Sequence, residues 1–364
     1  MKHKRIIIGG GGTGGHVFPA ISIAQALRRK APGTEILFVG AEGKLEMEKV
    51  PEAGFAIEGL PIAGFQRRLT WQNLVFFKKL WKSIRKSKAI IRRFKPDIAV
   101  GVGGYASGPI LRAAARKNIP VVLQEQNSYA GVTNRILSGK AKKIFVAYEG
   151  MEKYFPAERI IFTGNPVRKD IPGSGEKRED AFRFFGLDNS KPVVLVTGGS
   201  LGAGTINESI RKNLDLFGKE TQLLWQSGRN YYEELSREIR PADHPNIRLL
   251  PFIENMKYAY TVADVIISRA GAGTISELAL VGKPVILVPS PNVAEDHQTK
   301  NAMALVNKNA AILVADKDAG KELVASCMNL LADPEKRKKI AENILAMAMP
   351  DSADRIADEI LSMV

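Results

Sequence analysis

A glycine-rich loop followed by a histidine has the residue types of an anion-binding site. Residues 9–15 of this loop lead into His16 and then Pro19, which suits the first turn of a helix. Glycines let the backbone approach a ligand closely, and a helix start offers unpaired N–H groups to an anion. A histidine at the mouth of such a loop can donate a hydrogen bond or act as a base near neutral pH. We therefore predict that this loop binds a ligand and that His16 takes part in its chemistry.

The same loop contains a formal match to the dinucleotide fingerprint G-x-G-x-x-G, at residues 10–15. An NAD-binding unit also needs an acidic residue, at a set distance after the loop, to bind the ribose. The nearest candidates are Glu35 and Glu42, and the glycine fingerprint alone is a weak indication. A structural tight turn and an NAD-dependent oxidoreductase stay open as alternatives.

A second glycine-rich loop and one arginine have the chemistry to bind phosphate. The loop Gly-Gly-Ser-Leu-Gly-Ala, at residues 198–203, has Ser200 at its centre, and its hydroxyl and N–H groups can donate to phosphate oxygens. Arg168 follows Thr-Gly-Asn-Pro-Val and could direct its guanidinium at a diphosphate. A tight turn and a surface arginine are the purely structural alternatives.

A third segment, Ser-Arg-Ala-Gly-Ala-Gly-Thr-Ile-Ser-Glu at residues 268–277, ends an apolar run and begins a helix. Its helix start and Thr274 would face a diphosphate, while the Glu277 carboxylate could accept from both hydroxyls of a ribose. The alternative role of Glu277 is to stabilise the helix start electrostatically. Gln298, in the polar segment 295–302, is suited to binding sugar hydroxyls, unless that segment is only a solvated face.

The elements that must position these residues form two similar α/β halves. Short β-branched runs alternate with amphipathic segments of helix length, the pattern of a parallel sheet. The runs occupy residues 5–8, 36–39, 98–102, 121–124, 144–147 and 160–163, then 193–197, 223–226, 248–251, 265–268 and 285–289. A polar stretch at residues 171–180 indicates a linker. We predict an α/β protein of two Rossmann-like domains, residues 1–166 and 167–364, facing one another across a cleft, with the last helix able to pack back on the first domain.

Positive charge is concentrated in the first half. The 364 residues carry a net charge of +15 from 53 Lys and Arg and 38 Asp and Glu; residues 1–168 hold 29 and 11 of these, which leaves 53 − 29 = 24 and 38 − 11 = 27 for the rest. This asymmetry indicates an anionic partner, either nucleic acid, a membrane surface or a phosphorylated substrate. A single cysteine, Cys327, excludes an internal disulfide framework and suits a reducing cytoplasm. No metal cluster, secretion signal or run near the ~20 apolar residues of a membrane span is apparent.

The basic residues gather in one stretch that contains aromatic side chains. No acidic residue occurs between Gly59 and Pro96. At helical spacing, one face would carry Leu74, Phe77, Trp81 and Ile84, flanked by lysines and arginines. Such a segment suits a helix lying on an anionic membrane, and the alternative is a core helix. We predict membrane contact through residues 65–95, and no nucleic-acid partner because no recognised binding module is present.

Six motifs in this order resemble the MurG family of peptidoglycan N-acetylglucosaminyltransferases, and together they are far more specific than any one. They are Gly-Gly-Thr-Gly-Gly-His-Val-Phe-Pro-Ala (11–20), Gly-Gly-Tyr-Ala-Ser-Gly-Pro (103–109), Gln-Glu-Gln-Asn (124–127) with Asn134, Thr-Gly-Asn-Pro-Val-Arg (163–168), the loop at 198–203 and the segment at 269–277. The resemblance runs to about Ala302. It implies a GT-B fold and an inverting transfer, without a cofactor or metal, from UDP-N-acetylglucosamine to muramoyl-pentapeptide diphospho-undecaprenol.

The resemblance also implies roles for single residues. The donor would be held by Ser200, Ile253, Thr274, Glu277 and Gln298, with Ile253 presenting its backbone to uracil and Arg168 contacting the diphosphate. The acceptor face would comprise Thr13, Gly14, Gly15, His16, Tyr105, Asn127 and Asn134, of which Thr13, Gly14, Gly15 and Asn127 are also assigned to the donor. Such an enzyme works peripherally at the cytoplasmic face of the bacterial plasma membrane, in cell-wall synthesis and hence in cell shape and division.

Inversion requires a base on one side of the anomeric carbon and stabilisation of the departing UDP on the other. Arg168, the Ser200 loop and the helix start near Thr274 could neutralise the charge that builds on the β-phosphate. We predict His16 as the base, with Glu125 as the second candidate. A UDP-sugar epimerase or a glycolipid synthase of the same fold is the alternative function, although neither needs the motif at residues 124–127.

Overall fold

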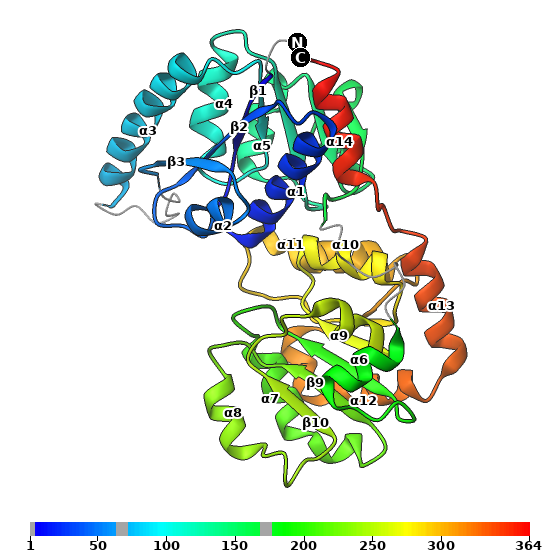
Figure 1. The fold of residues 1–364 in the computed structure, drawn as a ribbon. Helices are drawn as coiled ribbons and strands as arrows, with labels where there is room; N and C mark the ends of the chain where they lie inside the picture. Colours follow the sequence, from blue (N-terminus) through cyan, green and yellow to red (C-terminus); the bar gives the residue numbers. More distant parts are fainter. Residues whose placement is uncertain (1–3, 63–71, 168–176) are drawn as a thin grey trace. The chain divides into compact units, whose positions relative to one another are not determined.

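The structure is a computed structural model that describes residues 4–62, 72–167 and 177–364, with the backbone alone for residues 72–77 and 294. The chain forms two compact units (Figure 1). Unit 1 comprises Met1–Arg168 and Met349–Val364, and unit 2 comprises Lys169–Ala348.

Unit 1 is built on a parallel sheet whose described strands follow the order β3-β2-β1-β4-β5-β6-β7. The strands are β1 (Arg5–Gly9), β2 (Glu35–Ala41), β3 (Ala56–Leu60), β4 (Ile98–Gly101), β5 (Val121–Glu125), β6 (Lys143–Val146) and β7 (Ile160–Phe162). The helices are α1 (Gly14–Lys30), α2 (Glu46–Glu52), α3 (Gln72–Phe94), α4 (Ser107–Ala115), α5 (Val132–Leu137) and α14 (Ser352–Leu361).

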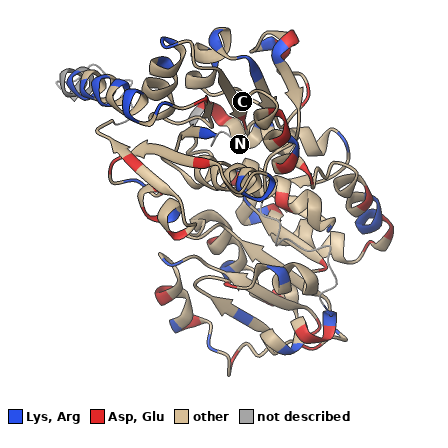
Figure 2. Ribbon diagram, turned by 45° about the horizontal axis from the view of Figure 1, so that its top comes forward, with Lys and Arg blue, Asp and Glu red and all other residues tan. Residues whose placement is uncertain are grey.

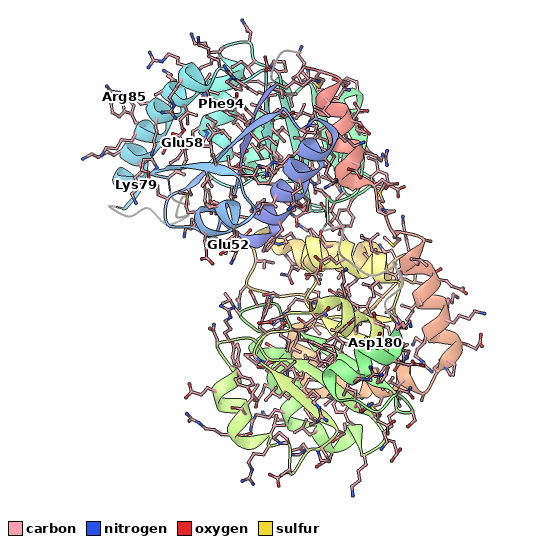
Figure 3. The ribbon with its side chains drawn as sticks, viewed as in Figure 1. Glu52, Glu58, Lys79, Arg85, Phe94 and Asp180 are labelled. Carbon is pink, nitrogen blue, oxygen red and sulfur yellow. The ribbon has the colours of Figure 1, made fainter. Side chains whose placement is uncertain are left out.

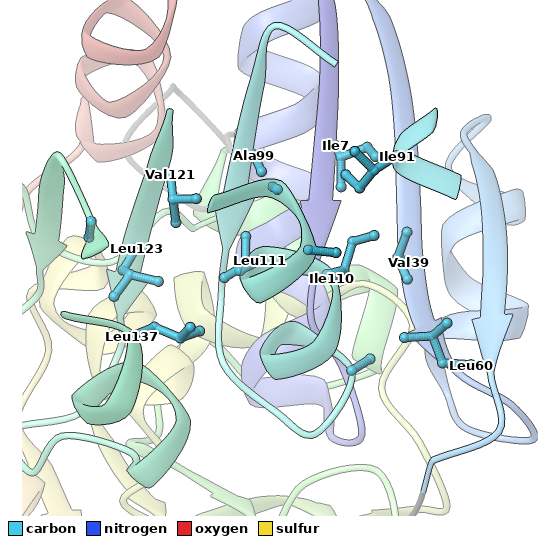
Figure 4. Close-up of a cluster of buried hydrophobic side chains, with 14 of the residues drawn as sticks. Ile7, Val39, Leu60, Ile91, Ala99, Ile110, Leu111, Val121, Leu123 and Leu137 are labelled. Carbon is cyan, nitrogen blue, oxygen red and sulfur yellow. The ribbon is translucent and has the colours of Figure 1, made fainter. Parts of the chain in front are cut away.

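Apolar side chains cover both faces of this sheet because successive strand residues point to opposite sides. Ile7 packs into one layer with α3, α4 and α5, and Figure 4 shows Ile110 and Leu111 of α4 in this layer. Ile6 and Ile8 pack into the other layer, with α1 and α14. Both faces are therefore closed by helices, and the strand ends are where polar residues can gather.

Helix α14 belongs to unit 1 although it follows unit 2 in the chain. Ile356, Ala357 and Ile360 are fully buried in the layer that also contains α1. At the rim, Arg29 pairs with Asp354 at 2.8 Å and Lys30 pairs with Asp358 at 2.8 Å. The second apolar layer of unit 1 is thus completed by residues from the far end of the sequence.

Unit 2 repeats the plan, with the described strand order β10-β9-β8-β11-β12-β13. The strands are β8 (Val193–Thr197), β9 (Gln222–Gln226), β10 (Ile247–Leu250), β11 (Val265–Ser268), β12 (Val285–Leu287) and β13 (Ile312–Leu313). The helices are α6 (Arg178–Phe185), α7 (Gly204–Lys212), α8 (Tyr232–Glu238), α9 (Met256–Val262), α10 (Ala272–Val281), α11 (His297–Val306), α12 (Ala319–Leu331) and α13 (Pro334–Leu345).

The prediction of parallel α/β halves is confirmed, with three local differences. Strands β3 and β13 were missed; both lie at sheet edges, Glu58 and Gly59 interrupt the apolar pattern of β3, and β13 has only two residues. Of the predicted linker, residues 171–176 lie outside the described part of the chain, and Arg178 already begins α6. Pro19 does not lie in the first turn of α1, since that helix begins five residues earlier, at Gly14.

Candidate functional site

In unit 1 the predicted residues gather where the sheet order reverses. β1 lies between β2 and β4, so the loops after β1 and β4 meet at the carboxyl ends of the strands, the usual ligand position in open α/β sheets. The two loops touch through backbone: a Cβ on Gly104 would lie 2.2 Å from the Gly11 carbonyl oxygen. Only a glycine at position 104 permits this approach.

His16 lies directly over the second of these loops. A Cβ on Gly103, whose φ is +89°, would come within 2.9 Å of the imidazole Nε2. At the other end of the ring, Nδ1 lies 3.2 Å from the Thr13 hydroxyl. Thr13 precedes α1, whose first two residues are Gly14 and Gly15, so the helix start and the imidazole share one corner. Tyr105 is an exposed aromatic on the loop after β4.

Glu125, at the end of β5, is buried and holds the next loop in place. Its Oε1 accepts from the backbone N–H of Asn127 at 3.1 Å and from the Asn127 amide at 3.3 Å. Its Oε2 accepts from the Gly131 N–H and from the Asn134 amide, both at 2.9 Å. Burial raises the pKa of this carboxyl, and the four N–H donors oppose the shift. Since each oxygen already accepts twice, the geometry favours a positioning role over that of a base.

A carboxylate that sequence reasoning missed organises the first glycine loop. Glu46 of α2 is 1% exposed and accepts from the N–H groups of Gly12 at 2.8 Å and Ala41 at 2.9 Å. A Cβ on Gly11 would lie 2.2 Å from its Oε1. The loop before His16 therefore packs around a buried glutamate. Because Glu46 lies among other charged residues, the sequence around it did not indicate that it is buried.

In unit 2 a pocket of about 510 Å³ opens at the carboxyl ends of the neighbouring strands β8 and β11, where the strand order reverses. Three predicted donor residues, Thr274, Glu277 and Gln298, line it together. The glycine loop after β8 contributes Gly198, Gly199 and Gly202. Other residues also line it, among them Tyr231, Met256, Tyr260, Arg269, Ser290 and Asn292.

Hydrogen bonds and an ion pair orient three polar side chains of this pocket. The Tyr260 hydroxyl lies 3.3 Å from Oε2 of Glu277 and donates to it, which fixes the carboxylate of α10. The Ser290 N–H donates to Oε1 of Gln298 at 2.9 Å, so the amide nitrogen is what Gln298 can offer a ligand. Arg269 pairs with Asp316 and donates to the carbonyl of Val288 at 3.0 Å, which ties the pocket wall to the next strand.

Three other predicted residues have different surroundings. Ser200 is exposed at the tip of its loop. Ile253 is buried and does not line the pocket. Its N–H donates to the side chain of Gln226 at 2.8 Å, so only its carbonyl oxygen is left to bind a nucleobase. Arg168 lies outside the described residues.

Helix α3 carries the predicted basic surface, which we define as the exposed residues Lys78, Lys79, Trp81, Lys82, Arg85, Lys88 and Arg92. Figure 2 shows Lys and Arg recurring along it, and Figure 3 labels Lys79 and Arg85 among its side chains. The predicted face is exposed at Trp81, which is 61% exposed, while the helix packs inward through Ser83, Ser87 and Ile90. The side chains of Leu74 and Phe77 lie outside the description.

Within the part of the chain that the structure describes, no helix is long and apolar enough to span a membrane. In the same residues no group of three or more His, Cys, Asp or Glu is arranged to hold a metal ion.

The sequence matches two family models, the glycosyltransferase family 28 N-terminal domain over residues 6–146 and its C-terminal domain over residues 193–356. A relative from Parabacteroides distasonis, named UDP-N-acetylglucosamine--N-acetylmuramyl-(pentapeptide) pyrophosphoryl-undecaprenol N-acetylglucosamine transferase, is 55% identical over 100% of this chain and 99% of its own. A relative of the same name from Flavobacterium psychrophilum is 48% identical over 100% and 99%.

Solved structures agree. The crystal structure of Acinetobacter baumannii MurG superposes with a TM-score of 0.80 at 29% identity, covering 99% of both chains. A UDP-GlcNAc 2-epimerase from Neisseria meningitidis, at a TM-score of 0.68 and 18% identity over 99% of this chain and all of its own, shares the fold. Family models covering both halves and full-length relatives at this identity lead to one conclusion: the chain belongs to glycosyltransferase family 28 and, within it, to the MurG family.

Proposed function

We propose that this protein transfers N-acetylglucosamine from UDP-N-acetylglucosamine to the 4-hydroxyl of a muramoyl pentapeptide linked to undecaprenyl diphosphate. The observation that carries the proposal is the 55% identity, over the whole chain, with a transferase of that name. Both units also hold their polar residues at the sheet position where α/β proteins bind ligands. The product is the disaccharide lipid from which peptidoglycan is built.

In the proposed reaction, unit 2 holds the donor. Glu277, oriented by Tyr260, accepts from the ribose hydroxyls, Ile253 offers its carbonyl to uracil, and Gln298 donates to the sugar. The N–H groups of the glycine loop and of the start of α10 donate hydrogen bonds to the diphosphate, as do Ser200 and Arg168. These groups stabilise the charge that develops on the β-phosphate as its bond to the anomeric carbon breaks.

Unit 1 binds and activates the acceptor. The acceptor oxygen attacks the anomeric carbon from the side opposite UDP, and His16 removes its proton, so the configuration inverts. Thr13, Gly14, Gly15, Tyr105, Asn127 and Asn134 surround this hydroxyl. The buried carboxylate of Glu125 fixes the two asparagines and leaves the proton transfer to His16.

Incubation of the purified chain with labelled UDP-N-acetylglucosamine and a lipid-linked muramoyl peptide tests the proposal. We expect a labelled disaccharide lipid and one equivalent of UDP. Conversion of the donor to its 2-epimer without any acceptor would instead assign the epimerase chemistry of structures that share the fold.

Glu277→Ala should weaken UDP binding by roughly 10- to 100-fold, because a charged hydrogen-bond acceptor is worth about 1.5–3 kcal/mol. Isothermal titration with UDP measures the change. Tyr260→Phe, which removes only the hydroxyl that orients this carboxylate, serves as the milder comparison. Equal UDP affinity in Glu277→Ala and the unaltered protein would remove the ribose role.

We further propose that the basic surface of α3 rests on the anionic cytoplasmic face of the plasma membrane, where the lipid acceptor lies. Trp81 is exposed among these cations, with the Arg85 guanidinium 5.8 Å from its ring centre. An exposed indole beside several lysines and arginines is typical of interfacial helices. Each basic residue close to such a membrane contributes about 1 kcal/mol.

Trp81→Ser combined with Phe77→Ser should lower sedimentation with anionic vesicles by about tenfold, while activity on a water-soluble acceptor analogue survives. Phe184→Ser is the matched control, since Phe184 is an exposed aromatic of unit 2, outside the basic surface. Vesicle binding that survives the double substitution in both low and high salt would place the membrane contact elsewhere.

A further inference from the structure

Gln226 is a buried polar residue for which the proposed reaction has no role so far. It is the last residue of β9, and its side-chain amide makes three hydrogen bonds. Nε2 donates to the Thr197 hydroxyl at 3.1 Å and to the Gly199 carbonyl at 3.0 Å. Oε1 accepts from the Ile253 N–H at 2.8 Å.

The sheet order explains why one amide reaches both places. β9 lies between β8 and β10, so a side chain at its carboxyl end lies between the loops that follow its two neighbours. Thr197 is the last residue of β8 and Gly199 belongs to the loop that follows it, and both line the pocket. Ile253 belongs to the segment after β10. Gln226 is thus the link between the loop that faces the diphosphate and the segment that faces the base.

The loop after β8 also packs tightly on the chain that follows Gln226. A Cβ on Gly228 would lie 2.1 Å from the Gly202 nitrogen, and the Arg229 N–H donates to the Ser200 carbonyl at 3.3 Å. Because the loops after β8 and β9 touch through backbone atoms, neither can move without the other. The Gln226 amide then sets the distance between this pair of loops and the segment after β10.

We propose that Gln226 is a positioning residue that fixes the spacing between the diphosphate loop and the base-binding segment, and so selects a nucleoside diphosphate of the right length. The inference rests on the proposed function, which places UDP in this pocket. The role needs both ends of the amide, because Nε2 donates to the loop after β8 while Oε1 accepts from the segment after β10. Leucine removes both, and a carboxylate keeps the acceptor but sets an oxygen against the Gly199 carbonyl.

Titration of the full-length protein with UDP tests this role. Gln226→Leu should raise the Kd for UDP by roughly tenfold or more. Gln226→Glu should bind UDP poorly at pH 8 and recover as the pH falls towards 5.5, relative to the unaltered protein, because protonation gives the introduced carboxyl an O–H to donate. A residue that matters only for folding would not produce this pH profile.

Gln222 provides a matched control on the same strand. It is also buried, and its amide bonds the backbone of Asp188, at 2.8 Å and 2.7 Å, at the opposite end of β9. Gln222→Leu should lower Tm without changing the Kd for UDP. Should Gln226→Leu unfold, the isosteric Gln226→Glu carries the test.

Two outcomes overturn the inference while leaving the proposed function in place. One is an unchanged Kd in Gln226→Leu with a Tm lowered as in the control, and the other is a Gln226→Glu profile parallel to that of the unaltered protein. Failure of the unaltered protein to bind UDP would overturn both the function and the inference.

Discussion

His16→Ala should reduce turnover by roughly 100- to 10,000-fold, the range for losing a general base, while UDP binding is unchanged. The imidazole is held at both ends, with Nδ1 3.2 Å from the Thr13 hydroxyl and the Nε2 edge over Gly103. A base at Nε2 requires the tautomer in which Nδ1–H donates to Thr13. Thr13→Val should therefore lower turnover as well, but by less, because it removes only the group that selects the tautomer.

The pH dependence of kcat/KM measures this role most directly. The unaltered protein should show an acidic limb near neutrality, where the free imidazole takes up a proton. His16→Ala should lack that limb. A limb that persists in the variant would assign the base to another residue, and Glu125 would be tested next.

Glu125→Gln should lower kcat/KM for the lipid acceptor by about 100-fold without changing the Kd for UDP. Four N–H donors converge on the carboxylate, and an amide can satisfy only those that face its single oxygen. Losing the two charge-assisted hydrogen bonds on the other oxygen, at about 1.5–3 kcal/mol each, is more than enough to displace either Asn127 or Asn134. Unlike the histidine variant, this one should keep the limb near neutrality.

The difference in stability between the unaltered protein and this variant should also depend on pH with a definite sign. Burial raises the folded-state pKa of Glu125 above its usual value of 4.5, so the folded protein binds more protons than the unfolded chain between the two pKa values. The unaltered protein should therefore lose stability, relative to Glu125→Gln, as the pH rises through the folded-state pKa. Urea unfolding at several pH values measures it, with the exposed Glu152→Gln as control. A difference independent of pH would contradict this assignment.

The central elements of both units were predictable because their strands are buried on both faces and leave continuous apolar runs such as residues 193–197. The edge strands β3 and β13 were not, because Glu58 and Gly59 interrupt the apolar pattern of β3 and β13 has only two residues. On α3, periodicity assigned Trp81 to the same face as Ile84 because it weighs residues by hydrophobicity. Periodicity did not show that the opposite side packs through Ser83 and Ser87, whose small size allows the close approach of α4.

The glycine loops could be found in the sequence, but the residues that shape them could not. Glu46 and Gln226 act through hydrogen bonds to backbone groups that are distant along the chain, and nothing local distinguishes them from surface residues. The contact of His16 with Gly103 likewise exists only once β1 and β4 are paired.

The position of α14 has a consequence for the order in which the protein is made. Its buried face covers α1, yet the ribosome must add all of residues 169–348 before α14 is synthesised. At about 5–20 residues per second this takes roughly 10 to 40 s. During that interval α1 lacks part of its cover, so the nascent first unit presents an apolar strip suited to a chaperone while the second unit can already fold.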